Sequence, residues 1–309
     1  MGGNSNQQKP SGSAHHGHEM RGILLVLLGV TCWGFSATCV SFLTDHNGVD
    51  VPWLACVRLF VSGLLFLIIA FVKDRDKFSA FARDKTLIRD LVVYILVAVV
   101  MMQLGYMSCI KLTNAGTALL LMEISVPMVL IVECVRSRRA PRLIEYISVA
   151  LATIGVVFIA TQGNLGSLAI NPLGLMWGMF TAVANAGYIL IPRRLVKECG
   201  TLVLNGVAFF SASFLFMPFA RPWESPAMLD VEGWLVFAGI VLIGTMLAYA
   251  AFLRGAYDAG PVIASLIGVF EPVSGAVISA LWLGTIFTGW DILGGLCIIT
   301  MMILVALKK

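Results

Sequence analysis

Long apolar stretches alternate with short polar segments along almost the whole chain. A helix needs about 20 apolar residues to cross a bilayer, and ten stretches of about that length can be read. These predicted spans cover residues 22–43, 51–72, 90–110, 115–135, 143–161, 172–192, 201–219, 233–253, 260–283 and 288–307. Unbroken apolar runs indicate helices, because the strands of a membrane β-barrel alternate apolar and polar residues. The pattern predicts an all-α integral membrane protein with no sizeable soluble domain.

Composition supports this interpretation and excludes several classes of protein. Of 309 residues, 59% are apolar and 12% are charged, and the mean hydropathy is +0.92. Soluble domains are nearer ~45–50% apolar and ~25% charged. An ordinary cytosolic enzyme and a nucleic-acid-binding protein are therefore excluded. No enzyme activity, cofactor or metal site is expected, and none of the four histidines falls in a predicted span.

The polar N-terminus and the cysteines add two smaller predictions. Residues 1–20 are rich in Gly, Ser, Asn and Gln, a composition typical of a disordered tail. Most of the seven cysteines lie within predicted spans, and no C-x-x-C pair occurs. They are expected to stay reduced and to serve in packing.

Lys and Arg are distributed unevenly between the two sides of the predicted bundle. With the N-terminus in the cytoplasm, 18 of the 21 basic residues fall in cytoplasmic segments. Only Lys111 and Arg221 fall outside, and Arg58 lies within a span. Such an excess follows the positive-inside rule. A multi-pass protein of the cytoplasmic (inner) membrane, with both termini cytoplasmic, is therefore predicted, and ten spans are consistent with it.

The two halves of the chain share a pattern. Tyr106 is followed five residues later by Lys111, and Tyr249 five residues later by Arg254, each pair preceding an Ala-Gly step. The repeat unit is five spans. Because five is odd, the second copy enters the membrane from the opposite side, as in many secondary transporters. The fold expected is ten transmembrane helices in two inverted five-helix repeats, with a substrate site between them.

Short motifs are spread over both halves: Cys-Trp-Gly-Phe-Ser at 32–36, Arg58, Asn-Ala-Gly at 114–116, Asp-Ala-Gly at 258–260 and Glu-Pro at 271–272. Together they resemble the EamA-type transporters of the drug/metabolite transporter superfamily. The resemblance implies one EamA repeat over residues 21–161 and another over 171–307. It also implies a cavity lined mainly by the first, third, fourth, sixth, eighth and ninth spans. Members of the family move chemically diverse solutes, so the resemblance names no substrate.

Three charged residues lie well inside predicted spans: Arg58, Glu123 and Glu271. Such groups are costly, about 2.5–3.5 kcal/mol each, and usually face a cavity or a partner. The glutamates can serve as a site for a cation or a proton, or they can act as helix caps or as fixed partners of Arg58. Arg58 can bind a carboxylate or phosphate of the substrate, but a structural pair with a glutamate is the interpretation we favour.

A proline closely follows each of these glutamates. Pro127 follows Glu123, and Pro272 follows Glu271. Proline removes one helical hydrogen bond and leaves the carbonyl four residues earlier without its donor. The pattern therefore predicts a helix break in both spans, with free carbonyls at Glu123 and Gly268.

Polar and aromatic residues recur at helical spacing in several predicted spans. We expect a cavity with aromatic walls, a common form of small-molecule site. Interhelical packing is the alternative for each residue. The candidates beyond the charged groups are Trp33, Gln103, Tyr106, Thr181, Asn185, Tyr188 and Tyr249.

These features predict a secondary transporter of small metabolites such as amino acids, organic cations or drugs, working by alternating access. Proton coupling is expected from the glutamates, and analogy with the family favours export. Its expected partners are the substrate, the lipid bilayer and protons, and it is expected to be a monomer or a homodimer. The alternatives are a passive facilitator and a membrane sensor or scaffold that transports nothing.

Overall fold

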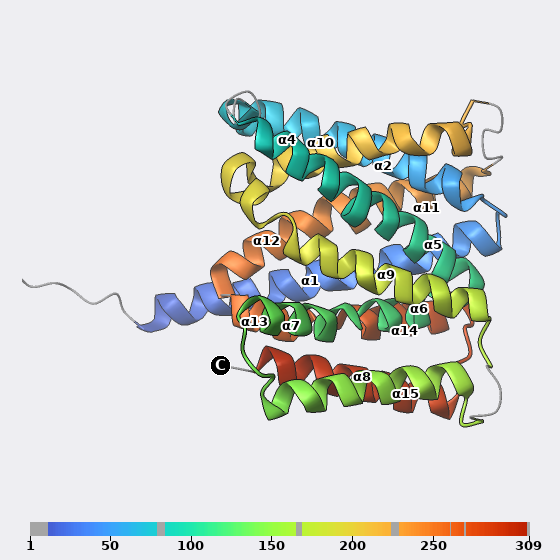
Figure 1. Cartoon of the computed structure of the whole chain (residues 1–309). Coiled ribbons are helices and arrows are strands. Elements are labelled where there is room, and N and C mark those ends of the chain that lie inside the picture. Colours follow the sequence, from blue (N-terminus) through green and yellow to red (C-terminus); the bar gives the residue numbers. More distant parts are fainter. Residues whose placement is uncertain are drawn as a thin grey trace, which may run out of the picture.

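Helices make up every regular element of the described chain (Figure 1). The computed structural model describes residues 12–78, 84–164, 169–223, 229–259, 261–268 and 270–307. The elements of the first half are α1 (Gly12–Asp45), α2 (Val51–Lys73), η1 (Arg75–Phe78), α4 (Lys85–Val93), η2 (Tyr94–Val100), α5 (Met101–Leu112), α6 (Ala115–Met122), α7 (Ser125–Arg136) and α8 (Leu143–Thr161). Those of the second half are α9 (Pro172–Leu190), α10 (Arg193–Ala220), α11 (Val231–Val241), η3 (Leu242–Leu247), α12 (Ala248–Ala259), α13 (Pro261–Gly268), α14 (Phe270–Leu283) and α15 (Gly289–Ala306).

Within the described residues, nine helical runs are long and apolar enough to cross a membrane. They correspond to nine of the ten predicted spans. The remaining predicted span, residues 260–283, contains α13 and α14, which are 8 and 14 residues long. The fourth predicted span is also interrupted, because α6 ends at Met122 and α7 begins at Ser125. The interrupted spans adjoin one another, with α6 beside α14 in the middle of the bundle (Figure 1).

The first helix begins earlier than the apolar pattern predicts. α1 starts at Gly12, whereas the predicted span starts at residue 22, and its membrane-spanning part starts at Met20. Residues 12–20 are therefore helical, and the prediction of a disordered tail is wrong for them. Residues 1–11 of that predicted tail lie outside the described chain.

The two halves interleave along the whole bundle. The most extensive helix contacts pair an element of the first half with one of the second: α2 with α10, α1 with α12 and α14, α8 with α15, and α5 with α9. Each half therefore buries its apolar helix faces mainly against the other half. Any cavity in the centre of the bundle has walls from both.

Glycine permits the closest of these approaches. A Cβ atom on Gly34 of α1 would lie 2.6 Å from the backbone nitrogen of Gly275 in α14. The two backbones touch here, four residues after Glu271 in the chain. The position of α14 is thus set by direct contact of its backbone and of the Ser274 hydroxyl group with α1.

Gly34→Ala is expected to destabilise the protein by about 1–3 kcal/mol, because the added methyl group overpacks a backbone contact. Thermal unfolding of the purified protein measures the effect. Gly239→Ala is the matched control, since a Cβ atom there meets its nearest neighbour, a ring carbon of Phe35, at 3.4 Å. Equal stability of the two variants would show that the α1–α14 contact is not close in solution.

Charged residues at the helix ends are held by caps and ion pairs. The side chain of Asp84 accepts the Thr86 backbone N–H at 2.8 Å at the start of α4, and it pairs with Arg194 of α10 at 2.6 Å. Hydrogen bonds from the Thr86 hydroxyl and backbone lower the pKa of the Asp84 carboxyl, so it stays ionised at neutral pH. Glu145, at the start of α8, is buried and pairs with Arg139 at 2.6 Å. These two carboxylates therefore stabilise the starts of α4 and α8.

The outer surface is strongly apolar. Phe219, Leu281 and Ile286 are 78%, 83% and 88% exposed. Exposed apolar area of this extent suits contact with lipid. All seven cysteines are free, and six of them are buried, which agrees with the prediction that they are reduced.

Candidate functional site

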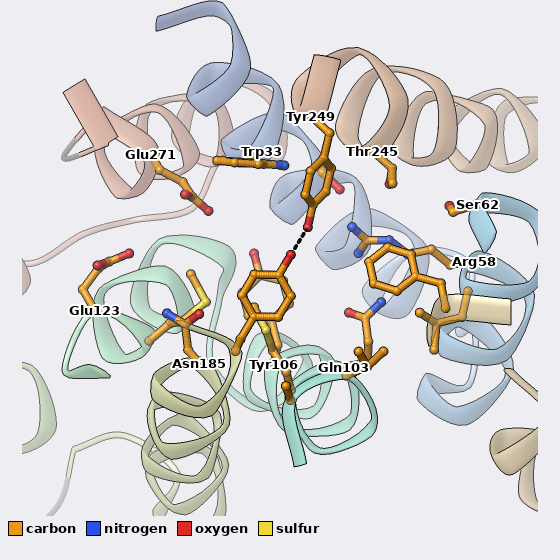
Figure 2. Close-up of a pocket in the computed structure, with 18 residues that line it drawn as sticks. Trp33, Arg58, Ser62, Gln103, Tyr106, Glu123, Asn185, Thr245, Tyr249 and Glu271 are labelled. Carbon is orange, nitrogen blue, oxygen red and sulfur yellow. Dashed lines mark hydrogen bonds between the residues drawn. The ribbon is translucent and has the colours of Figure 1, made fainter. Parts of the chain in front are cut away.

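A cavity of about 210 Å³ lies in the middle of the bundle, between the two halves (Figure 2). First-half residues come from α1, α2, η2, α5 and α6, and second-half residues from α9, α10, η3, α12 and α14. All nine predicted binding or coupling residues line it: Trp33, Arg58, Gln103, Tyr106, Glu123, Asn185, Tyr188, Tyr249 and Glu271. The structure thus brings together residues that are spread over almost 240 positions of the chain. Their roles in binding and coupling stay predictions.

The two glutamates form an acidic end of this cavity. Glu123 directly follows the last residue of α6, and Glu271 is the second residue of α14. Figure 2 shows both at the same end, and their carboxyl groups interact electrostatically. No hydrogen bond or ion pair of either carboxyl group occurs within the described residues. Both groups are therefore available to a ligand or a proton.

The predicted helix breaks occur, but one predicted free carbonyl does not. The chain turns at Glu123 and Ile124, before Pro127. The Glu123 carbonyl accepts the backbone N–H of Val126 at 3.0 Å, so it is not left free. The turn supplies a donor one residue before the position that proline removes. In the second half Pro272 is the third residue of α14, and α13 ends at Gly268; the residue between these helices lies outside the described chain.

A bridge of aromatic residues crosses the middle of the cavity. The hydroxyl groups of Tyr188 and Tyr249 are 2.9 Å apart and hydrogen-bonded, as the dashed line in Figure 2 marks. Trp33 meets the ring of Tyr249 edge-on at 5.4 Å between centroids. Tyr188 also packs against Tyr94 at 5.7 Å. These residues come from α9, α12, α1 and η2, so the bridge joins the two halves.

Replacing either tyrosine of this bridge by phenylalanine removes the hydrogen bond between the two hydroxyl groups. We expect Tyr188→Phe and Tyr249→Phe to destabilise the protein singly, and the double variant to lose less than the sum. The coupling energy should be about 0.6 kcal/mol and at most ~1.7, the range for hydrogen bonds between membrane helices. Thermal unfolding of the four proteins gives the value. Strictly additive losses would show that the hydroxyl groups do not interact.

Arg58 lies at the end of the cavity opposite the glutamates (Figure 2). Its Nη1 atom is buried and has no hydrogen-bond partner. The groups that interact electrostatically with the guanidinium are Tyr106, Tyr249 and Cys39, with no carboxylate among them. The ion pair between Arg58 and a glutamate, which the sequence analysis favoured, is therefore absent from this conformation. The two charged ends stay apart, with the tyrosines between them.

One predicted lining residue faces elsewhere. Thr181 of α9 is fully buried and donates its hydroxyl to the Trp177 carbonyl at 2.7 Å. A Cβ atom on Gly105 of α5 would lie 2.6 Å from that hydroxyl, so Thr181 packs against α5 and not into the cavity. Asn185, one turn further on, does line the cavity, and its amide donates to Ser125 at 2.9 Å.

Each half contains one π-helical segment, and the sequence did not reveal them. η2 interrupts the third span and η3 the eighth. The backbone N–H of Met101 donates to the carbonyl of Leu96, and that of Ala248 to the carbonyl of Ile243, both five residues earlier. Each π-helical segment lies just before a predicted site tyrosine, Tyr106 or Tyr249. Such turns often occur at functional sites.

Several lining residues also escaped the sequence analysis. Ser62 of α2 and Phe209 of α10 belong to the second and seventh spans, which were not expected to line the cavity. Thr245 lies within η3, one turn before Tyr249, and its hydroxyl donates to the Ile240 carbonyl of the same span at 3.0 Å. A serine or threonine in an apolar span carries little signal, because such residues often bond only to their own helix.

Comparison with known protein families gives a match to each half of the chain. The model of the EamA-like transporter family matches residues 20–161 and again residues 172–307. The chain belongs to the EamA-like transporter family. Together the two matches cover almost the whole chain.

Individual relatives align with most of the chain. The chain is 29% identical to the uncharacterized inner membrane transporter YicL of Salmonella typhimurium over 293 residues, which are 95% of this chain and 97% of the relative. It is 21% identical to the transporter YwfM of Bacillus subtilis, with 88% of each protein covered. A protein of known crystal structure aligns with a TM-score of 0.58 at 16% identity, covering 94% of this chain and 96% of the other. That likeness shows the fold, and the relatives' names indicate a multi-pass membrane transporter.

Proposed function

We propose that this EamA-like protein is a secondary transporter that moves a small metabolite, such as an amino acid or an organic cation, by alternating access. The observation that carries the proposal is the cavity, in which polar and charged residues of both halves meet at the centre of an apolar bundle. Ionisable residues in membrane spans are expensive and usually mark a transport path. A relative motion of the two halves would open such a cavity first to one side and then to the other.

The architecture proposed is ten membrane-spanning segments in two inverted five-helix repeats. Three observations support it. The family model matches twice, the third and eighth spans each contain a π-helical segment, and the fourth and ninth spans are each built from two helices. The start of α1 and the C-terminal end also lie at the same end of the bundle (Figure 1), as an even number of spans requires.

The orientation proposed places both termini in the cytoplasm of a cell whose inner membrane holds the protein. The distribution of Lys and Arg supports it, with 18 of 21 on that side. In this orientation the end that carries Asp84 and Arg194 faces the cytoplasm. Export of the substrate is proposed by analogy with the family.

Proton coupling is proposed for the pair of glutamates. Two carboxyl groups that interact in a site shielded from water cannot both carry a charge cheaply. A cation that enters between them replaces the proton they hold. Proton and substrate then compete for one site, and competition of this kind produces antiport.

Uptake by liposomes containing the purified protein tests the proposal. The liposomes are acidic inside, and the bath holds a mixture of amino acids, quaternary amines, organic acids, nucleosides and sugars. Mass spectrometry should find at least one compound accumulated above the level in empty liposomes. Accumulation that is indifferent to the pH gradient would identify a passive facilitator. Protein that binds metabolites but moves none of them would favour a sensor.

A further inference from the structure

Three buried polar groups that line the cavity lack hydrogen-bond partners, and two of them, on Arg58 and Ser62, lie at the same end (Figure 2). Arg58 Nη1, Ser36 Oγ and Ser62 Oγ are each shielded from solvent and form no hydrogen bond. All three residues line the cavity. A buried donor left unsatisfied costs free energy, more so when it is charged. Native structures seldom keep such groups without a use, because buried polar groups are almost always bonded.

The basic character of this end is not neutralised by the protein. Among the residues that the structure describes, no carboxylate pairs with the Arg58 guanidinium, so its charge is available to a ligand. A guanidinium presents a planar fork of donors that matches a carboxylate in a bidentate arrangement. One guanidinium balances one negative charge, which suits a monoanionic carboxylate better than a doubly charged phosphate ester.

The opposite end has the complementary character. Glu123 and Glu271 lie there at one end of the cavity (Figure 2), and within the described residues neither carboxyl group forms an ion pair with a basic residue. Trp33 and Tyr249 add aromatic faces along the wall between the ends (Figure 2). Carboxylates beside aromatic rings suit an ammonium group.

The two ends belong to one site. Arg58, Glu123 and Glu271 line the same cavity, and Tyr249 lies between its two ends (Figure 2). A single small molecule in this cavity therefore lies between both charged ends. The cavity volume of about 210 Å³ limits the ligand to a small metabolite.

We infer that the cavity takes a small zwitterion, with its carboxylate on Arg58 and its ammonium group on Glu123 and Glu271. A ligand with only a positive group would leave the buried guanidinium without a partner. A ligand with only a carboxylate would leave the two glutamates without one. A zwitterion satisfies both ends without adding net charge to the membrane interior. The inference rests on the proposed transport function for its use, but it concerns binding, which is measured separately.

Thermal stability of the purified protein tests it with matched probes. The panel holds the common amino acids and glycine betaine, together with choline, small monocarboxylates, nucleosides and sugars. At least one zwitterion at saturating concentration should raise the unfolding temperature by about 5 °C. Its methyl ester, which lacks the carboxylate, and its N-acetyl derivative, which lacks the ammonium group, should each bind at least about tenfold more weakly.

Variants assign the two ends of the ligand. Arg58→Gln should weaken binding of the zwitterion at least about tenfold and leave binding of its methyl ester unchanged. Retained ester binding also shows that the variant is folded. Arg194→Gln, which removes an exposed arginine at the end of α10, is the control and should change neither.

The results that overturn the inference leave transport itself open. They are stabilisation by cations or acids alone, stabilisation by no zwitterion of the panel, and equal zwitterion binding by Arg58→Gln and the unsubstituted protein. Conversely, zwitterion binding without uptake into liposomes would uphold the inference and contradict the proposed transport function. The two failures are thus distinguishable.

Discussion

Glu271→Gln should abolish uptake driven by a pH gradient while the protein stays folded. Glutamine keeps the size and polarity of the side chain but cannot release or bind a proton in the working pH range. If the carboxyl pair exchanges a proton for the substrate, the variant loses the driving force. Uptake into liposomes that are acidic inside should fall to the level of empty liposomes. Exchange of internal for external substrate without a gradient needs no proton. It should persist at raised substrate concentration, because Glu123 remains to bind the ammonium group that the two glutamates share.

Two further variants make this result interpretable. Glu123→Gln should reduce pH-driven uptake as well, because Glu123 and Glu271 interact. Asp291→Asn removes a carboxylate that accepts the Thr288 backbone N–H at 2.8 Å and so caps α15. It should lower stability by about 1 kcal/mol and leave coupling intact. Full pH-driven uptake by Glu271→Gln would remove this residue from the coupling mechanism.

Deletion of Leu242 should be tolerated far better than deletion of Leu64. Both are lipid-exposed leucines near the middle of a span, but Leu242 lies in η3 and Leu64 in the regular helix α2. A π-helical turn holds one extra residue, so losing one restores an α-helical turn and keeps the following residues in phase. In α2 a deletion rotates everything beyond it by about 100°.

Thermal unfolding and elution as a single species measure the difference between the two deletions. The Leu242 deletion should stay folded, with Tyr249 still hydrogen-bonded to Tyr188. The Leu64 deletion should aggregate or lose its unfolding transition, because it turns half of α2 away from α10. Equal loss of folding in both would mean that the π-helical turn of η3 carries more of the stability than its geometry indicates.

The fold was predictable because the bilayer enforces it. Apolar runs of about 20 residues have one stable form in lipid, so nine spans appeared where predicted. The breaks near Glu123 and Glu271 were predictable for a similar reason, since proline cannot continue a hydrogen-bonded helix. The start of α1 was missed because residues 12–20 are polar.

The site was predictable where a residue is costly in lipid, and unpredictable where a polar side chain can bond to its own helix at little cost. Arg58, Glu123 and Glu271 were identifiable from charge alone, and all three line the cavity. Thr181 was placed wrongly because a single period cannot tell which polar residue bonds to its own helix. Thr245 was missed because a threonine in an apolar span often bonds only to its own helix, as it does here with the Ile240 carbonyl. The predicted ion pair between Arg58 and a glutamate was wrong, because a list of charged residues does not show which of them lie close together in the fold.

Cysteine labelling of the cavity tests most directly whether it is the transport path. Met102 lines the cavity, is half-buried and makes no polar contact that its replacement would break. Met102→Cys in membrane vesicles of either orientation is treated with a small membrane-impermeant thiol reagent, and the unsubstituted protein gives the background of its own cysteines. Alternating access predicts modification from both faces and loss of uptake once Cys is modified. Modification from one face only, or uptake that survives full modification, would contradict the proposed path.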